Sequence, residues 1–419
     1  MKGRSLLMIP GPIEFEPDVL SALGKPTPSH LAPAFLDAFG GALASMREAW
    51  LCPSGQPLVV AGSGTFAMEL AAANLVEPGD RALVVSTGVF GDRFVDLLGR
   101  HGAEVTALSA DVGGGVDLNR IEDAARKTKP RLLTVTHVDT STGVRMPIAE
   151  IGALARRHGA ISVIDGVCSV AGEEIRQEAW QLDVVLTASQ KAIGVPPGLA
   201  LLVAGPRALE RFEARKQPVR SYYADWSKWL PVMRAYEART PSYFGTPPVN
   251  LICALSVSLR QIREEGMDVR FVRHEKLSRA FQAGADALGL RQVPADSTWR
   301  AHTLTACYLP DGIGVSPFVR AVGSAGVIIA GGLHPDIRER TFRVGHMGAV
   351  RRRHPGRPWG DRNGAPGGRY GLPAGSGRGG RRAHVGWHLW RLIARARTLA
   401  GRCAAARTPR FQAGRRVLG

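Results

Sequence analysis

Short Val/Ile/Leu-rich runs alternate with longer amphipathic stretches between residues 58 and 203, and this alternation constrains the fold more than any other feature. Such runs are typical of strands buried on both faces, and the longer stretches are typical of helices that cover them. The expected strands are Leu58–Ala61, Ala82–Ser86, Glu104–Ala107, Leu132–Thr136, Ile161–Asp165, Val184–Thr187 and Leu199–Val203. The expected helices are Thr65–Leu75, Gly91–Arg100, Leu118–Lys127 and Pro147–His158. This order predicts an α/β fold with a mainly parallel sheet.

The length of 419 residues exceeds the usual size of one domain, so a second unit is expected. A helical pattern runs through Leu259–Arg263, and helix and strand signals continue to about Val350. We predict an N-terminal arm over residues 1–20, a large domain over 21–262, a small α+β C-terminal domain over 263–350 and an atypical tail over 351–419.

The net charge of +18 is concentrated in that tail. Residues 351–419 hold 17 arginines, no lysine and one acidic residue, Asp361, which leaves 37 basic and 35 acidic residues in the rest of the chain. The near-neutral main part argues against nucleic acid as its partner. Out-of-frame GC-rich codons would produce the arginine and glycine bias of the tail, so we expect it to be disordered or the product of a shifted reading frame. A nucleic-acid-binding appendage is the rival interpretation.

Membrane and metal chemistry are not expected. No apolar run approaches the roughly 20 residues of a membrane span, and Pro10-Gly11-Pro12 ends the N-terminal apolar patch before a signal-peptide core could form. A cytoplasmic location follows as an expectation. The five cysteines are far apart and show no CxxC pair, so neither a zinc site nor a disulfide framework is predicted.

A lysine follows one of the predicted strands. Lys191 ends the segment Thr187–Lys191 and precedes the small, proline-containing segment Ala192–Gly198. Burial lowers the pKa of a lysine, and a neutral amine is what carbonyl attack and Schiff-base formation require. For this motif alone, a solvated surface lysine is the alternative.

A carboxylate ends another strand, at Asp165. A charge after mostly apolar residues is costly unless it meets a cation. A protonated pyridine nitrogen is such a cation, and keeping it protonated makes the ring an electron sink. An aspartate that caps the strand-to-loop junction is the alternative.

A glycine-rich turn, Ala61–Thr65, joins the strand from Leu58 to a helix. Glycines let backbone N–H groups approach a phosphate, and the helix N-terminus adds donors and positive potential. The signal is weak alone, because a plain strand-to-helix turn looks the same. The order of this turn, the strand-end Asp165 and the strand-end Lys191 is more specific.

Four further segments carry a resemblance to a known family: Leu7–Pro12, Thr136–Gly143, Asp165–Ser169 and Ala188–Ala192. They resemble the class-V aminotransferases, which are pyridoxal-phosphate (PLP) enzymes of fold type I, and among these the alanine–glyoxylate aminotransferases. The resemblance covers about residues 5–350. It implies a Schiff base between PLP and Lys191, with Asp165 on the pyridine nitrogen.

The resemblance also implies roles for other residues. These are phosphate binding by Ser63, Gly64, Thr65 and Gln190, stacking on the ring by Phe90, a hydroxyl beside the cofactor from Thr140, and contacts from Tyr243 and Thr246 to the phosphate of a neighbouring subunit. A homodimer is therefore expected. Arg343, in Thr341–Gly345, matches the arginine that grips the substrate carboxylate, for which its planar guanidinium is suited.

The expected reaction is transamination between a small amino acid and a 2-oxo acid, with alanine and glyoxylate giving pyruvate and glycine. Serine–glyoxylate or ureidoglycine–glyoxylate transfer is the alternative within the family. A cysteine desulfurase would need a cysteine on a mobile loop, whereas Cys307 lies in an expected strand. Nucleic-acid binding through the basic tail is the alternative from another class.

Overall fold

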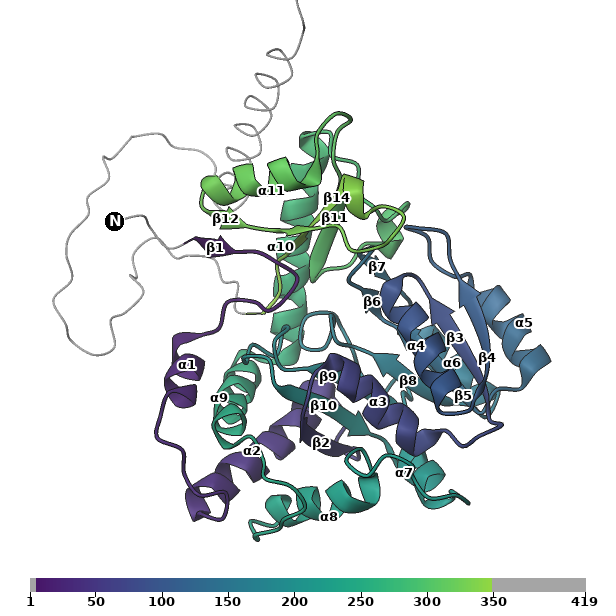
Figure 1. Cartoon of the computed structure of the whole chain (residues 1–419), viewed down its shortest axis with the longest axis vertical. Coiled ribbons are helices and arrows are strands. Elements are labelled where there is room, and N and C mark those ends of the chain that lie inside the picture. The colour runs from purple at the N-terminus through teal and green to yellow at the C-terminus, as the bar shows by residue number, and fades with distance from the viewer. Residues whose placement is uncertain (1–4, 349–419) are drawn as a thin grey trace, which may run out of the picture. The chain divides into compact units, whose positions relative to one another are not determined.

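The computed structural model describes residues 5–348. A seven-stranded sheet forms the centre of this part of the chain, with the strand order β2-β10-β9-β8-β5-β3-β4 (Figure 1). The strands are β2 Gln56–Ala61, β3 Arg81–Ser86, β4 Glu104–Ser109, β5 Leu132–Thr136, β8 Ile161–Asp165, β9 Val184–Ala188 and β10 Leu199–Ala204. Each expected strand is present, with ends that differ by at most two residues.

The sheet is mainly parallel, as predicted. Neighbouring strands from β9 to β4 are parallel, and only β10 runs against both of its neighbours. Most side chains in the central strands are buried, which explains their continuous apolar runs. The register sets Thr136 opposite Asp165, and Asp165 opposite Leu186. The carboxyl ends of β5 and β8 therefore lie beside the end of β9.

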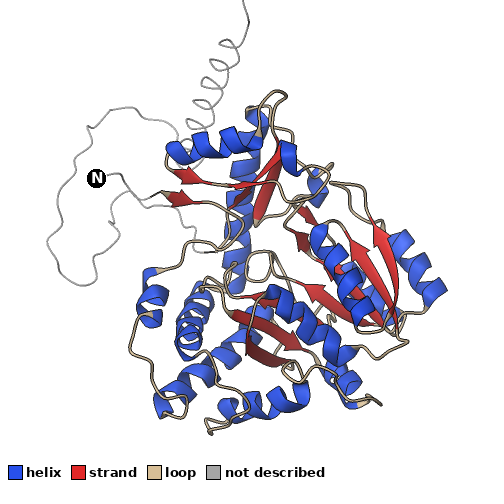
Figure 2. Cartoon of the chain, viewed as in Figure 1, coloured by secondary structure: helices blue, strands red, loops and turns tan. Residues whose placement is uncertain are grey.

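Helices cover the sheet (Figure 2). Helix α3 (Gly64–Leu75) packs against α4 (Val89–Arg100), and α5 (Leu118–Thr128) packs against α6 (Ile148–Arg157). Parallel crossovers are right-handed, so the two pairs lie on opposite faces. Helices α2 (Pro33–Trp50), α7 (Pro206–Glu213) and α8 (Trp226–Glu237) also pack against this sheet. Helix α9 (Val249–Glu265) packs against α2, and α1 (Pro17–Leu23) packs against α9.

A smaller sheet, in the order β11-β14-β13, follows the long helix α10 (Met267–Ala287). Its strands are β11 Leu304–Tyr308, β13 Ala330–Gly331 and β14 Thr341–Gly345, with α11 (Val315–Ser324) beside them. Strand β1 (Leu6–Leu7) pairs with β12 (Val327–Ile328), so the start of the chain lies beside its later part (Figure 1). A hairpin of β6 (Val138–Asp139) and β7 (Val144–Arg145) follows β5.

Helix starts have local causes in several places. Ser63 caps α3, Asp117 caps α5 and Asp225 caps α8, each through its side-chain oxygen. None of the helices within residues 5–348 combines the length and the apolar character that a membrane-spanning helix requires. The tail expected over 351–419 lies outside the described residues, and the boundary near residue 262 stays a prediction.

Candidate active site

Asp165 lies at the carboxyl end of β8, where only 2% of its surface is exposed. One carboxylate oxygen accepts the Val167 N–H at 2.9 Å, and the other is 3.4 Å from the Thr136 hydroxyl. Burial and, to a smaller extent, the nearby Asp139 carboxyl raise the pKa of this carboxyl to about 6. A cation at this position would stabilise the ionised form.

Lys191 lies three residues beyond the end of β9, close to the N-terminal arm. Its ammonium group donates a hydrogen bond to the Pro10 carbonyl at 2.5 Å. Gly11 has a φ of +124°, and a Cβ there would lie 2.5 Å from Lys191 Cδ. A glycine is therefore required where the lysine passes over the arm. The role of Pro10 and Gly11 was not predicted, although both lie in a segment of the family resemblance.

The turn before α3 lies next to both of these strand ends. A Cβ on Gly64 would lie 2.8 Å from Val167 Cγ2 and 3.4 Å from Ala188 Cβ, so the helix N-terminus packs closely between the segments that carry Asp165 and Lys191. Ser63 and Thr65 are exposed beside it. Their hydroxyls and the free backbone N–H groups of the first turn suit an anion.

Phe90 is half-buried in the first turn of α4. Its backbone N–H donates to the Asp139 carboxylate at 2.9 Å, and the Arg93 guanidinium lies 4.9 Å from its ring centroid. Arg93 also donates to the Thr65 hydroxyl at 2.6 Å, which links α4 to the turn before α3. Phe90 and the phosphate-binding candidates therefore share one side of the site.

Asp139 is a residue of this site that was not predicted. It is completely buried, and it accepts hydrogen bonds from the backbone N–H groups of Phe90, Gly91 and Ser141 and from the Ser141 hydroxyl. Burial raises the pKa of its carboxyl. Asp139 therefore fixes the start of α4 from the hairpin after β5. Its only signal in the sequence is its place in the segment Thr136–Gly143.

Arg343 projects from β14 and lies against the segment that contains Thr140. Its Nε donates to the Gly331 carbonyl at 2.9 Å and its Nη1 to the Thr140 carbonyl at 3.3 Å. Within residues 5–348, no carboxylate lies at ion-pair distance from this guanidinium, and burial lowers its pKa. The buried Cys168 thiol lies within electrostatic range of both Arg343 and Lys191. Arg343 and Lys191, the predicted substrate-binding arginine and cofactor-binding lysine, therefore both lie near Cys168.

Thr140 and Gln190 also lie at the site. Thr140 is buried in the loop that joins β6 to β7. Gln190 precedes Lys191, and its backbone carbonyl accepts the Ile13 N–H at 3.2 Å. The Gln190 side-chain oxygen is buried with no hydrogen-bond partner in the described part of the chain. An amide in this state can take a further ligand.

Tyr243 and Thr246 lie together but apart from the other candidates. Their hydroxyls are 3.4 Å apart, and Tyr243 is 64% exposed. The Tyr243 ring packs near His30, and the adjacent Phe244 packs against Trp229. No hydrogen bond in the described residues joins Tyr243 or Thr246 to Asp165 or Lys191. The structure therefore brings this pair together on an exposed surface of the chain.

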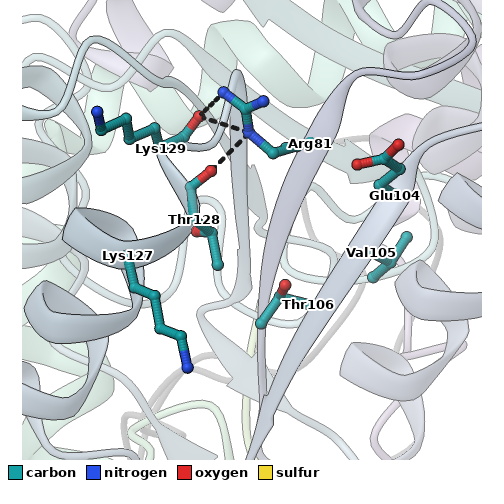
Figure 3. A pocket seen from close by; sticks show the side chains of 7 residues that line it. All are labelled: Arg81, Glu104, Val105, Thr106, Lys127, Thr128 and Lys129. Carbon is teal, nitrogen blue, oxygen red and sulfur yellow. Dashed lines mark hydrogen bonds between the residues drawn. The ribbon is translucent and has the colours of Figure 1, made fainter.

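A surface pocket elsewhere can be distinguished from this site (Figure 3). It is lined by Arg81, Glu104, Val105, Thr106, Lys127, Thr128 and Lys129. Arg81 begins β3 and Glu104 begins β4, so the pocket lies at the opposite end of the strands from Asp165. The Arg81 guanidinium already donates to the carbonyls of Thr128 and Lys129. Ligands of open α/β sheets bind at the carboxyl ends of strands, which favours the site around Lys191.

The Cys307 thiol is not placed to act as a nucleophile. It lies within β11 and is completely buried, and burial raises the pKa of its thiol to about 12. A thiol in this state is not nucleophilic at neutral pH. The structure thus agrees with the rejection of a cysteine desulfurase.

Comparison with known proteins identifies the family. The family model for class-V aminotransferases matches residues 28–351. Alanine–glyoxylate aminotransferase 1 of Saccharomyces cerevisiae is 38% identical to the chain, over 83% of the chain and 93% of that protein. The crystal structure of alanine–glyoxylate aminotransferase from Nostoc sp. has a TM-score of 0.78 at 32% identity, and covers 83% of this chain and 91% of that one. Ureidoglycine–glyoxylate aminotransferase of Bacillus subtilis has a TM-score of 0.77 at 28% identity, and covers 83% and 89%. The chain therefore belongs to the class-V aminotransferase family and is a PLP-dependent aminotransferase.

Proposed function

We propose that this enzyme transfers the amino group of alanine to glyoxylate, with pyruvate and glycine as products. The yeast and Nostoc relatives that bear the alanine–glyoxylate name support this choice of substrates. The observation that carries the proposal is the position of Arg343, whose half-buried guanidinium has backbone partners but no carboxylate at ion-pair distance in residues 5–348. Amino acids and 2-oxo acids both supply that carboxylate.

The residues of the site fit PLP. The pKa of Asp165, raised by burial, would return toward its ordinary value beside a pyridinium. The Gln190 side-chain amide, whose oxygen has no partner in the described residues, would donate a hydrogen bond from its NH2 group to the phosphate. The exposed hydroxyls of Ser63 and Thr65 and the N–H groups around Gly64 suit its phosphate. When bound, the cofactor supplies an electron sink for the bond that breaks at the substrate α-carbon.

Three side chains would then act on the substrate. Arg343 would bind its carboxylate through N–H groups that the carbonyls of Gly331 and Thr140 do not use. Lys191 would take the proton from the α-carbon and return a proton to the cofactor side. Phe90 would hold the ring by stacking, and Thr140 would lie beside it.

We also propose that the enzyme is a homodimer in the cytoplasm. The exposed Tyr243 and Thr246 support a homodimer in which they reach the phosphate of the partner's cofactor. The exposed rings of Tyr222 and Tyr223 nearby add apolar surface that a second copy would cover. We place the enzyme in the cytoplasm and in glycine formation, with a large domain over residues 21–262 and a small domain over 263–350.

Serine or ureidoglycine as amino donor is the second candidate, because a relative in Arabidopsis thaliana bears the serine–glyoxylate name and the Bacillus subtilis relative bears the ureidoglycine–glyoxylate name. Nucleic-acid binding through the basic tail concerns residues outside the described part of the chain.

The test is a comparison of amino donors. Purified enzyme is given glyoxylate with either alanine or serine, and pyruvate and hydroxypyruvate are measured. The proposal predicts a higher kcat/KM for alanine. A higher kcat/KM for serine would overturn the choice of donor while leaving the aminotransferase class intact.

A further inference from the structure

Glu173 is a completely buried carboxylate that follows β8 and lies outside the predicted set of cofactor and substrate contacts. Its Oε1 accepts the backbone N–H of Thr303 at 3.0 Å and also that of His302. Its Oε2 lies 3.1 Å from His302 Nδ1 and 3.5 Å from Arg145 Nη1. One carboxylate thus joins the loop after β8 to the residues before β11 and to the hairpin strand β7.

The surroundings keep this carboxylate ionised. Burial alone would raise the pKa of Glu173, but the His302 side chain and the charges of His302 and Arg145 lower it to about 2. Oε1 therefore has two directional backbone donors, whereas Oε2 has the side chains of Arg145 and His302 nearby but no hydrogen-bond partner in the described residues.

The backbone that Glu173 holds is tied to the strand of Arg343. The Thr303 carbonyl accepts the His346 N–H at 3.0 Å, so the residue before β11 is bonded to the residue after β14. Within the ladder, Ala306 pairs with Arg343. A shift of Thr303 would therefore move β11 and β14 together, and with them the guanidinium.

Glu173 is also connected along the chain to the strand that ends at Asp165. Glu173 lies eight positions after Asp165, and tight turns fill the segment between them. Val170 N–H donates to the Gly166 carbonyl at 2.8 Å, and Glu173 N–H donates to the Ser169 carbonyl at 2.7 Å. A short, hydrogen-bonded segment thus connects the residue that faces the cofactor ring to the residue that holds the arginine strand.

We propose that Glu173 is a positioning residue that fixes Arg343 relative to Asp165 and Lys191, so that the substrate carboxylate is bound with the α-carbon over the cofactor. This inference rests on the role proposed above for Arg343. Glu173 itself does not contact the substrate. Loss of the Glu173 carboxylate would lower the affinity for the substrate carboxylate, because β11 and β14 would shift and Arg343 would shift with them.

A residue with a merely structural role would behave differently. Asp183 provides the comparison, because it is also a buried carboxylate that accepts a backbone N–H, from Ser162, and pairs with an arginine, Arg207. It lies at the amino end of β9, the opposite end of that strand from Lys191. Asp183→Asn is therefore the matched control for Glu173→Gln.

The experiment measures binding of glycolate, an unreactive analogue of glyoxylate, to the holoenzyme by calorimetry, with thermal midpoints and PLP content of each variant. Glu173→Gln keeps an oxygen for the two backbone N–H groups but brings an uncharged amide to Arg145 and His302. We expect it to weaken glycolate binding about 3- to 30-fold, the range for residues that act through neighbours, with full PLP content. Glu173→Ala should weaken binding further if it folds.

The outcomes separate the two proposals. Unchanged glycolate affinity in Glu173→Gln, with Arg343→Ala impaired, overturns the inference and leaves the proposed function standing. Equal losses of affinity in Glu173→Gln and Asp183→Asn also overturn it, because the effect would then follow stability. Glycolate affinity that does not depend on Arg343, or no glycolate binding by the wild-type enzyme, overturns the proposed carboxylate site and the inference with it.

Discussion

Replacement of Arg343 by alanine tests the part of the site that selects substrates. The guanidinium has five N–H donors, and two of these meet the carbonyls of Gly331 and Thr140. Three donors remain for a carboxylate. Because the arginine is half-buried, a bound carboxylate would form a charge-assisted pair that is partly shielded from water.

The expected magnitude follows from that burial. Truncation of one partner of a buried, hydrogen-bonded charge pair costs about 2–5 kcal/mol, and each 1.4 kcal/mol corresponds to about tenfold. Arg343→Ala should therefore raise the half-saturation concentrations of alanine and glyoxylate by about 30-fold to several thousand-fold. PLP content should stay near that of the wild type, because no proposed phosphate or ring contact involves Arg343.

The assay is the rate of pyruvate formation at varied alanine and glyoxylate, with PLP content read from absorbance. Arg343→Lys is the matched variant, since it keeps the charge but loses the planar fork, and it should lie between wild type and alanine. Unchanged half-saturation concentrations in Arg343→Ala would refute the assignment. So would a loss of PLP from that variant equal to the loss of activity.

Three further predictions concern the cofactor side of the site and the buried thiol. Asp139→Asn should weaken PLP binding about tenfold by loosening Phe90, since bonds to a charged acceptor contribute about 1.5–3 kcal/mol; equal PLP affinity in a fluorescence titration against Asp183→Asn would contradict this. Because the pKa of Asp165 is raised to about 6, protonation of this carboxyl stabilises the folded protein without PLP. The protonated carboxyl would oppose binding of a pyridinium. PLP affinity should therefore fall as pH drops below about 6, and the difference between wild type and Asp165→Asn should vanish at low pH; parallel pH profiles of the two proteins would speak against this role. Cys307→Ala should keep near wild-type turnover, and a loss of activity without a loss of stability would reopen a role for its thiol.

The strands could be predicted from the sequence because their signal is local. A continuous apolar run marks each central strand, and the strand-end positions of Asp165 and Lys191 follow from it. The start of α4 was less accurate: the helix begins at Val89 and not at Gly91. The physical reason is Asp139, which caps the Phe90 N–H from 49 residues away.

The remaining site residues depend on contacts that no local pattern records. Lys191 meets the Pro10 carbonyl across 181 residues, and Glu173 meets the Thr303 N–H across 130. A buried carboxylate with such distant partners reads in the sequence as an ordinary acidic residue. The substrate-binding role of Arg343 was predicted from the family resemblance, because an arginine within a strand does not by itself indicate a substrate contact. The roles of Tyr243 and Thr246 stay predictions because they involve a second subunit.

Absorbance of the purified enzyme tests the central claim most directly. A protein that binds PLP through Lys191 is expected to be yellow, to lose its visible absorbance when alanine is added alone, and to regain it when glyoxylate follows. Lys191→Ala, with PLP supplied, should show neither change. A wild-type protein that stays colourless with PLP, or whose absorbance does not respond to alanine or to any other amino acid, would contradict the account, as would a Lys191→Ala variant that still cycles between the two states.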